Sequence, residues 1–255
     1  MTVLAHQLDR IVTIGAPPAS VFRYFTDSER WAAWWGAGST IDPRPGGRVY
    51  IRYPNAVEVV GEVIEVDAPS RIVFTYGFVS GKPVAPGESR VTIRLVPVAR
   101  GTKLHLVHAF SDTQARDEHV QGWRYQLSVF ANVVADAIHG DTGALVDRWF
   151  GIWSESDETA RTRTLEEIAS PAVQMRDRFS SVEGVDEVMR HIGAAQRFMP
   201  RMRLQREGPA QHCQGTVVAD WTAVGHDGQP RGRGTNVFIL SPEGRIDSVT
   251  GIWKM

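Results

Sequence analysis

The chain has 255 residues, of which 42% are hydrophobic and 22% charged, with 28 basic against 29 acidic side chains. This composition predicts a folded protein of one large or two ordinary domains, and its near-zero net charge offers no basic surface to nucleic acid or an anionic membrane. A single cysteine, Cys213, excludes an internal disulfide and a thiolate metal cluster. Because no apolar run approaches the roughly 20 residues of a membrane span and no secretory pattern opens the sequence, we expect a cytoplasmic protein.

The first half reads as strands bracketed by helices. A strand at 6–15 precedes the segment APPASVFRYFTDSERWAAWW, in which Pro17 and Pro18 open one short helix and Asp27 or Ser28 caps a second. Segments rich in Val, Ile, Tyr and Thr then recur at roughly ten-residue spacing between turn residues, which predicts an antiparallel meander. These segments cover 46–53, 57–69, 70–79, 89–99 and 102–110.

A long amphipathic helix is predicted over 113–138, where Trp123 is one of the apolar residues that recur at helical spacing. Such a helix must cover the preceding sheet. The pattern breaks at residues 139–142, which we interpret as a linker between a domain at 1–138 and a second domain at 143–255.

The second half combines helices with a later run of strands. Helices are predicted at 144–156, 157–168 and 184–199, and strands at 172–179, 201–207, 211–224, 231–240 and 245–253. Helices followed by an antiparallel sheet indicate α+β, so the predicted fold class of the whole chain is α+β in two domains.

Three tryptophans crowd the stretch SERWAAWWGAG. Trp31, Trp34 and Trp35 stand at i, i+3 and i+4, which is one face of one helical turn. A face that bulky is either buried as core or available to a ligand, and the sequence leaves both readings open. The two histidines of KLHLVH, His105 and His108, point to opposite faces of a strand and are expected to be satisfied singly rather than to share a metal.

The strand at 172–179 carries an isolated carboxylate on an apolar face. Val173, Met175, Asp177 and Phe179 share that face, since side chains alternate along a strand. Desolvation makes such a carboxylate a better proton acceptor, as a general base working near neutral pH requires. The alternative is a structural role, in an ion pair with a nearby arginine or in a contact within the SSVEG turn.

The same alternation assigns the faces of two other predicted strands. Asn236 falls on an apolar face with Phe238. On the strand before it, Trp221 falls on a face of small and apolar residues suited to lining a pocket, while His212 and Asp220 fall on the opposite face, toward solvent or a partner subunit.

Over residues 10–137 the chain resembles the START-like (SRPBCC) superfamily, and within it the group related to the activator of Hsp90 ATPase. The resemblance is carried by APPASVFRYFTDSERWAAWW, DPRPGGRVY, GEVIEVDAPSRIVFTY, VTIRLVPVARGTKLHLVHAF and HVQGW. It implies a helix-grip fold, in which a bent sheet closes around the long helix and leaves a mostly apolar cavity. The implied ligand-binding side chains there are Trp31, Trp34, Trp35 and Trp123.

Over residues 143–255 the chain resembles the NTF2-like superfamily, in its SnoaL-like and ketosteroid-isomerase-like branch. The matching segments are LVDRWFGIWSESD, VQMRDRF with EGVDEVMRHI, and GTNVFILSPEGRIDSVTGIW. The resemblance implies an α+β cone around one pocket, with Asp177 as base and with Trp149 and Asn236 at the positions of the oxyanion-hole donors. Indole and amide N–H groups are both donors, so they retain the ability to stabilise an enolate. The other implied pocket residues are Trp153, Met175, Phe179, Trp221 and Phe238.

Together these features predict a protein that binds a small, mostly apolar carbonyl-containing or aromatic molecule, polyketide-like or steroid-like. Proton transfer of the isomerase, cyclase or dehydratase type is expected in the second pocket, without cofactor or metal. The alternatives are a non-catalytic protein that binds or sequesters such molecules and, by analogy alone, an Hsp90-linked co-chaperone module. A homodimer through the outer face of the second sheet is the expected assembly, with neither nucleic acid nor membrane as a partner.

Overall fold

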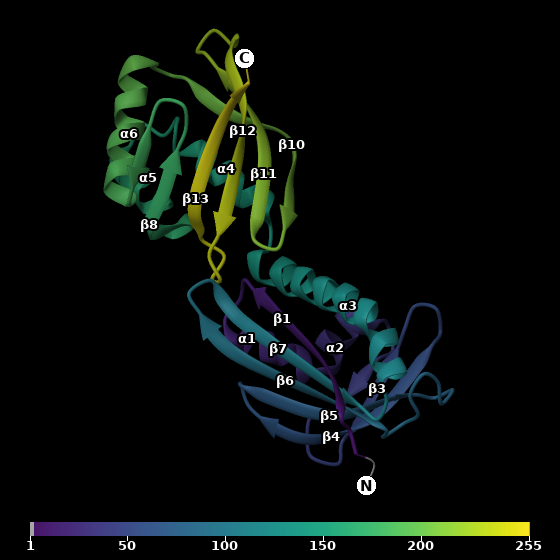
Figure 1. Ribbon diagram of the computed structural model, residues 1–255. Helices are drawn as coiled ribbons and strands as arrows, with labels where there is room; N and C mark the ends of the chain where they lie inside the picture. The colour runs from purple at the N-terminus through teal and green to yellow at the C-terminus, as the bar shows by residue number, and fades with distance from the viewer. Residues whose placement is uncertain (1–2, 255) are drawn as a thin grey trace. The chain divides into compact units, whose positions relative to one another are not determined.

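The computed structural model describes residues 3–254, which fold into two compact α+β units, one ending at Ala135 and the other starting at Asp136 (Figure 1). The predicted fold class is therefore confirmed. Within residues 3–254, no helix is both long and apolar enough to cross a membrane.

The first unit is a seven-stranded antiparallel sheet with a long helix beside it (Figure 1). The strand order is β1-β7-β6-β5-β4-β3-β2. The strands are β1 (His6–Ile14), β2 (Thr40–Ile41), β3 (Arg48–Arg52), β4 (Glu58–Asp67), β5 (Arg71–Phe78), β6 (Ser89–Val98) and β7 (Gly101–Phe110). The helices are α1 (Pro18–Phe22), a 3-10 turn η1 (Arg23–Phe25), α2 (Ser28–Trp35) and α3 (Thr113–His139).

Local sequence signals account for these elements. Helix α2 begins after Asp27, whose carboxylate accepts the backbone N–H of Arg30 at 3.0 Å and so satisfies one free donor of the first turn. Helix α3 is held to the sheet by polar contacts as well as apolar ones: the indole of Trp123 donates to Nδ1 of His108 on β7 at 2.9 Å. The other ring nitrogen of His108, Nε2, lies 2.7 Å from the hydroxyl of Ser89, so both nitrogens have partners. His105, on the other face of the strand, contacts Asp9 instead.

The second unit packs three helices against a six-stranded sheet of order β10-β11-β12-β13-β8-β9. The strands β13 and β8 pair in parallel and the other neighbours are antiparallel. The helices are α4 (Thr142–Gly151), α5 (Glu158–Ile168) and α6 (Val185–Phe198). The strands are β8 (Ala169–Arg176), β9 (Ser181–Glu183), β10 (Arg203–Cys213), β11 (Thr216–Val224), β12 (Pro230–Leu240) and β13 (Ile246–Lys254).

The prediction of strands at 201–207 and 211–224 was wrong in its division. Strand β10 continues to Cys213 across a bulge between Glu207 and Gln211. The chain reverses only afterwards, at Gln214 and Gly215, whose φ values are 48° and 86°. Two successive positive φ values suit a two-residue hairpin, because the turn then follows the twist of its strands.

The end of α3 belongs to the second unit. In this last part of α3, Oδ1 of Asp136 lies 2.9 Å from Nδ1 of His212. Nδ1 of His139 lies 3.0 Å from Nε2 of His212. His212, expected to face solvent or a partner subunit, therefore contacts this helical turn instead. Of the residues predicted as a linker, 139–142, only 140 and 141 lie between α3 and α4.

Candidate functional site

A cavity of about 630 Å³ opens into the second unit between the helices and the inner face of the sheet. This volume is within the range of small-molecule sites. Phe179 and Phe198 line it yet are 71% and 86% exposed, which places them at its mouth. The full lining consists of Trp149, Trp153, Met175, Arg176, Asp177, Phe179, His191, Ala194, Ala195, Phe198, Met199, Met202, Leu204, Trp221, Asn236, Val249, Gly251 and Trp253.

Asp177 lies in a turn directly after β8, half-buried at the cavity wall. Its Oδ1 accepts the backbone N–H of Phe179 at 2.7 Å and both the N–H and the hydroxyl of Ser180, at 2.8 and 3.0 Å. Its Oδ2 lies 3.5 Å from Nε1 of Trp253. One oxygen therefore fixes the turn and the other is turned toward the aromatic wall. The turn also explains why the strand ends at Arg176 rather than at 179, since aspartate side chains compete for backbone N–H groups in this way.

Asn236 is brought next to Asp177 by a glycine on the neighbouring strand. A Cβ placed on Gly251 would lie 3.2 Å from Cβ of Asp177 and 3.3 Å from Oδ1 of Asn236. The absence of a side chain at Gly251 thus leaves the space between the two polar groups open. Oδ1 of Asn236 accepts the indole N–H of Trp221 at 2.9 Å, which leaves the amide nitrogen without an acceptor among residues 3–254.

Two indole N–H groups in the cavity wall have no hydrogen-bond partner within the described part of the chain. They belong to Trp149, which is 0% exposed, and to Trp153 one turn later on the same segment. A buried donor without an acceptor costs about 1–3 kcal/mol, so each such group calls for an explanation.

The cavity therefore combines a mostly apolar wall with unpaired donors, one carboxylate and the side chains of Arg176 and His191. Donors of this kind stabilise negative charge on an oxygen, and an adjacent carboxylate removes or returns a proton. The described residues contain no group of His, Cys, Asp and Glu side chains placed to hold a metal ion.

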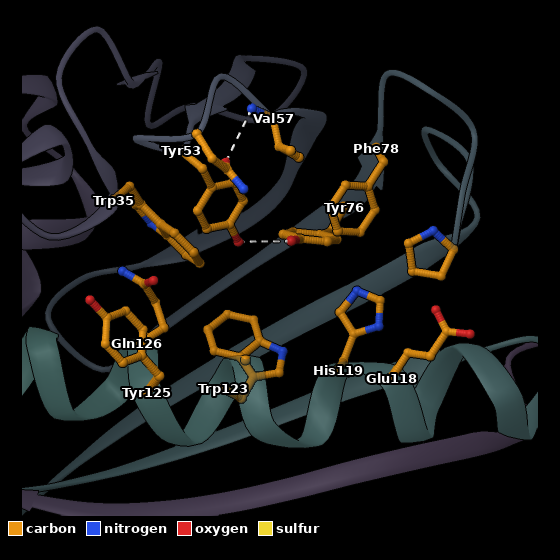
Figure 2. A pocket seen from close by; sticks show the side chains of 13 residues that line it. Trp35, Tyr53, Val57, Tyr76, Phe78, Glu118, His119, Trp123, Tyr125 and Gln126 are labelled. Carbon is orange, nitrogen blue, oxygen red and sulfur yellow. Dashed lines mark hydrogen bonds between the residues drawn. The ribbon is translucent and has the colours of Figure 1, made fainter.

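A second cavity, of about 420 Å³, lies in the first unit between α3 and the sheet (Figure 2). The predicted ligand residues Trp35 and Trp123 are both in its wall. Its lining consists of Trp35, Tyr53, Asn55, Val57, Tyr76, Phe78, Pro83, Glu118, His119, Gly122, Trp123, Tyr125 and Gln126.

The prediction that Trp31 and Trp34 bind a ligand is wrong, because both are core residues and neither lines this cavity. Trp31 is 0% exposed and Trp34 is 3% exposed. The indole of Trp31 donates to the carbonyl of Tyr50 at 3.2 Å, and that of Trp34 donates to the carbonyl of Tyr24 at 3.4 Å. Their polar atoms are thus already satisfied by backbone, and the rings fill the space beneath the short helices.

Of the residues predicted for the second cavity, only Phe238 is absent from the wall; it is 1% exposed and packs in the core against Trp149. Trp253 and Gly251 were missed, although they alternate on one strand face with Val249, a pattern that the sequence displays. In the first cavity His119 was missed, although it precedes Trp123 by four residues and therefore shares its helix face.

Comparisons with known proteins give a family for the first part of the chain and several similar solved structures. The family model described as activator of Hsp90 ATPase homolog 1-like protein matches residues 15–135. An AHSA1-like protein from Rhizobium etli is 31% identical over 51% of this chain and 82% of that one, with a TM-score of 0.42. A protein of the SnoaL-like family from Agrobacterium tumefaciens C58 is 24% identical over 47% of this chain and 99% of that one, with a TM-score of 0.44. CalU16 from Micromonospora echinospora is 24% identical over 54% of this chain and 83% of that one, also with a TM-score of 0.44. No match was found among the curated proteins.

The first unit has the sheet and long helix expected of a helix-grip domain, and the family model covers it from Gly15, the residue after β1, to Ala135 in α3. The second unit has the predicted α+β arrangement, and its helices and sheet enclose the cavity described above. Residues 15–135 of this chain therefore belong to the activator of Hsp90 ATPase homolog 1-like family.

Proposed function

We propose that the second unit binds a small, mostly apolar molecule with a carbonyl group and that Asp177 moves a proton on the carbon next to that carbonyl. The observation that carries this proposal is the pair of buried indole N–H groups, on Trp149 and Trp153, in the wall of a cavity that also holds a carboxylate. An apolar ligand packs against the aromatic wall without burying further unpaired polar groups, and its carbonyl oxygen gives the indole N–H groups an acceptor.

The proton transfer needs no group beyond these side chains. Oδ2 of Asp177 takes a proton from the α-carbon, and the C–H electron pair becomes the carbon–carbon double bond of an enolate whose oxygen carries the charge. Indole N–H groups and the free amide of Asn236 stabilise that oxygen. In a β,γ-unsaturated ketone the enolate is a dienolate, and return of the proton from Asp177 to its γ-carbon completes an isomerisation. In a diketone the enolate carbon attacks the second carbonyl carbon, whose oxygen takes the C=O electron pair and then the proton held by Asp177, which closes a ring.

A second candidate function is binding without chemistry. It is favoured by the turn at Asp177, where three hydrogen bonds to Oδ1 give the carboxylate a structural role of its own. The two candidates share the ligand and differ only in whether the bound ketone loses an α-proton.

Carbonyl recognition is tested with two ligands of nearly equal size, 2-tetralone and tetralin, of which only the first has a carbonyl. We expect the wild-type protein to bind the ketone about three- to tenfold more tightly, as one net hydrogen bond provides. Trp149→Phe should remove most of that difference, and Trp31→Phe, which changes an equally buried indole in the other unit, should leave it unchanged. Equal affinities for ketone and hydrocarbon in the wild type would overturn the proposal.

A further inference from the structure

The first cavity contains a histidine whose protonation pattern is set by its helix. Nδ1 of His119 lies 2.6 Å from the carbonyl oxygen of Ala115, one turn earlier on α3. A carbonyl only accepts, so Nδ1 carries the hydrogen, and the neutral ring then presents a lone pair on Nε2. Nε2 is buried and has no hydrogen-bond partner within residues 3–254. Figure 2 shows the ring rising from α3 into the space below Tyr76 and Phe78.

The surroundings keep this histidine neutral. Its ring is 7% exposed and is packed among aromatic rings, with centroids at 4.8 Å for Phe110, 5.1 Å for His108 and 5.7 Å for Tyr76. Burial lowers the pKa of His119, because the charged ring would lose its hydration. The backbone contact to Ala115 and the charge of Glu118 act in the opposite direction and are smaller. At neutral pH, Nε2 is therefore an acceptor.

A donor faces the cavity from the sheet. The hydroxyls of Tyr53 and Tyr76 lie 3.0 Å apart and form one hydrogen bond, in which one of them donates to the other (Figure 2). The hydrogen of the accepting hydroxyl has no partner among the described residues. Burial raises the pKa of Tyr53 to about 12 and raises the pKa of Tyr76 well above its usual value, so both hydroxyls keep their protons.

We propose that the first cavity binds a planar hydroxyaromatic molecule, whose hydroxyl donates to Nε2 of His119 and whose oxygen acceptor meets the free hydroxyl hydrogen of the Tyr53–Tyr76 pair. The cavity of about 420 Å³ has aromatic walls suited to a flat ring system. This inference concerns the first unit and does not depend on the function proposed for the second.

The charge of the lining selects the same class of ligand. Glu118 is the charged side chain in the wall, and His119 is neutral. A carboxylate ligand would be repelled by Glu118 and would offer His119 no hydrogen, whereas a phenol is neutral at pH 7 and brings its own donor. A phenol satisfies both Nε2 of His119 and the free hydroxyl hydrogen of the Tyr53–Tyr76 pair, and neither group requires an ion.

The test compares 2-naphthol with 2-methoxynaphthalene, which keeps the ring system and the oxygen but has no hydrogen to donate. Calorimetry of the full chain should give about three- to tenfold tighter binding of the naphthol. His119→Phe should abolish that preference, and His119→Gln, which keeps an acceptor oxygen, should retain part of it.

A second measurement uses the unaltered protein and so does not depend on whether the variants fold. The ¹⁵N signal of Nε2 of His119 should shift when 2-naphthol saturates the protein and should shift much less with the methoxy compound. It also separates this cavity from the one in the second unit. Equal affinities for the two compounds, or a His119 signal that stays in place at saturation, would overturn the inference.

Discussion

Replacing Trp149 by phenylalanine separates the role of its indole in binding from its role in stability. Trp149 is 0% exposed and its N–H is unpaired, whereas Trp221, in the same unit, is 4% exposed and donates to Asn236 at 2.9 Å. In either variant the smaller ring loses packing worth about 1–2 kcal/mol. In Trp149→Phe, removal of the unpaired donor returns about 1–3 kcal/mol, so the net change in the free energy of unfolding is near zero.

Trp221→Phe has no such compensation. It leaves Oδ1 of Asn236, a residue only 8% exposed, without its donor, which adds about 1–3 kcal/mol to the packing loss. We therefore expect Trp221→Phe to cost at least about 2 kcal/mol more than Trp149→Phe. This corresponds to a Tm lower by about 8 °C for the transition of a domain of this size. Calorimetric unfolding of both variants beside the wild type measures it, and a Trp149→Phe loss equal to or larger than that of Trp221→Phe would refute the reasoning.

Three further predictions follow from the geometry. Gly251→Ala places a methyl group between Asp177 and Asn236, at 3.2 and 3.3 Å, so it should weaken 2-tetralone binding at least tenfold while moving Tm by only a few degrees; unchanged affinity would contradict the position assigned to the ligand. Burial lowers the pKa of His108, so below the usual histidine pKa of 6.5 the unfolded chain binds a proton at this residue and the folded chain does not. The free energy of unfolding should therefore fall by up to about 1.4 kcal/mol per pH unit as the pH drops below 6.5. His108→Gln should flatten this slope in denaturant titrations, and an unchanged slope in the variant would assign the pH dependence to other groups. Gly234→Ala should lower Tm strongly, since its Cβ would lie 2.5 Å from a strand carbonyl, and a wild-type Tm would mean that the strands separate easily.

Periodicity predicted most of the elements because most strands have one buried face. Met175 and Val173 are buried as the alternation requires, and Trp221 lies on the cavity face. The alternation even placed Asp177 at the cavity, although the strand ends one residue before it and a turn completes the position. A shift of one residue would have reversed each of these assignments.

The features that periodicity missed depend on individual hydrogen bonds. Trp31, Trp34 and Trp35 look alike on one helical face, yet only Trp35 lines the cavity, because the other two find carbonyl acceptors at Tyr50 and Tyr24. Nε2 of His119 is identified as an acceptor by the contact of Nδ1 with the Ala115 carbonyl, which fixes the hydrogen on Nδ1. Neither distinction is written in the spacing of residue types.

Deuterium exchange at the α-carbon of bound 2-tetralone tests most directly whether Asp177 acts as a base. The ketone is incubated in D₂O with wild-type protein or Asp177→Asn, which retains an oxygen for the turn, and deuterium uptake is followed by mass spectrometry beside a protein-free control. We predict exchange well above the control in the wild type, and a loss of 10²- to 10⁴-fold in the catalysed rate in Asp177→Asn at unchanged ketone affinity. Equal exchange in the two proteins, or none above the control while the ketone is bound, would contradict proton transfer by Asp177 and leave the second unit as a binding domain.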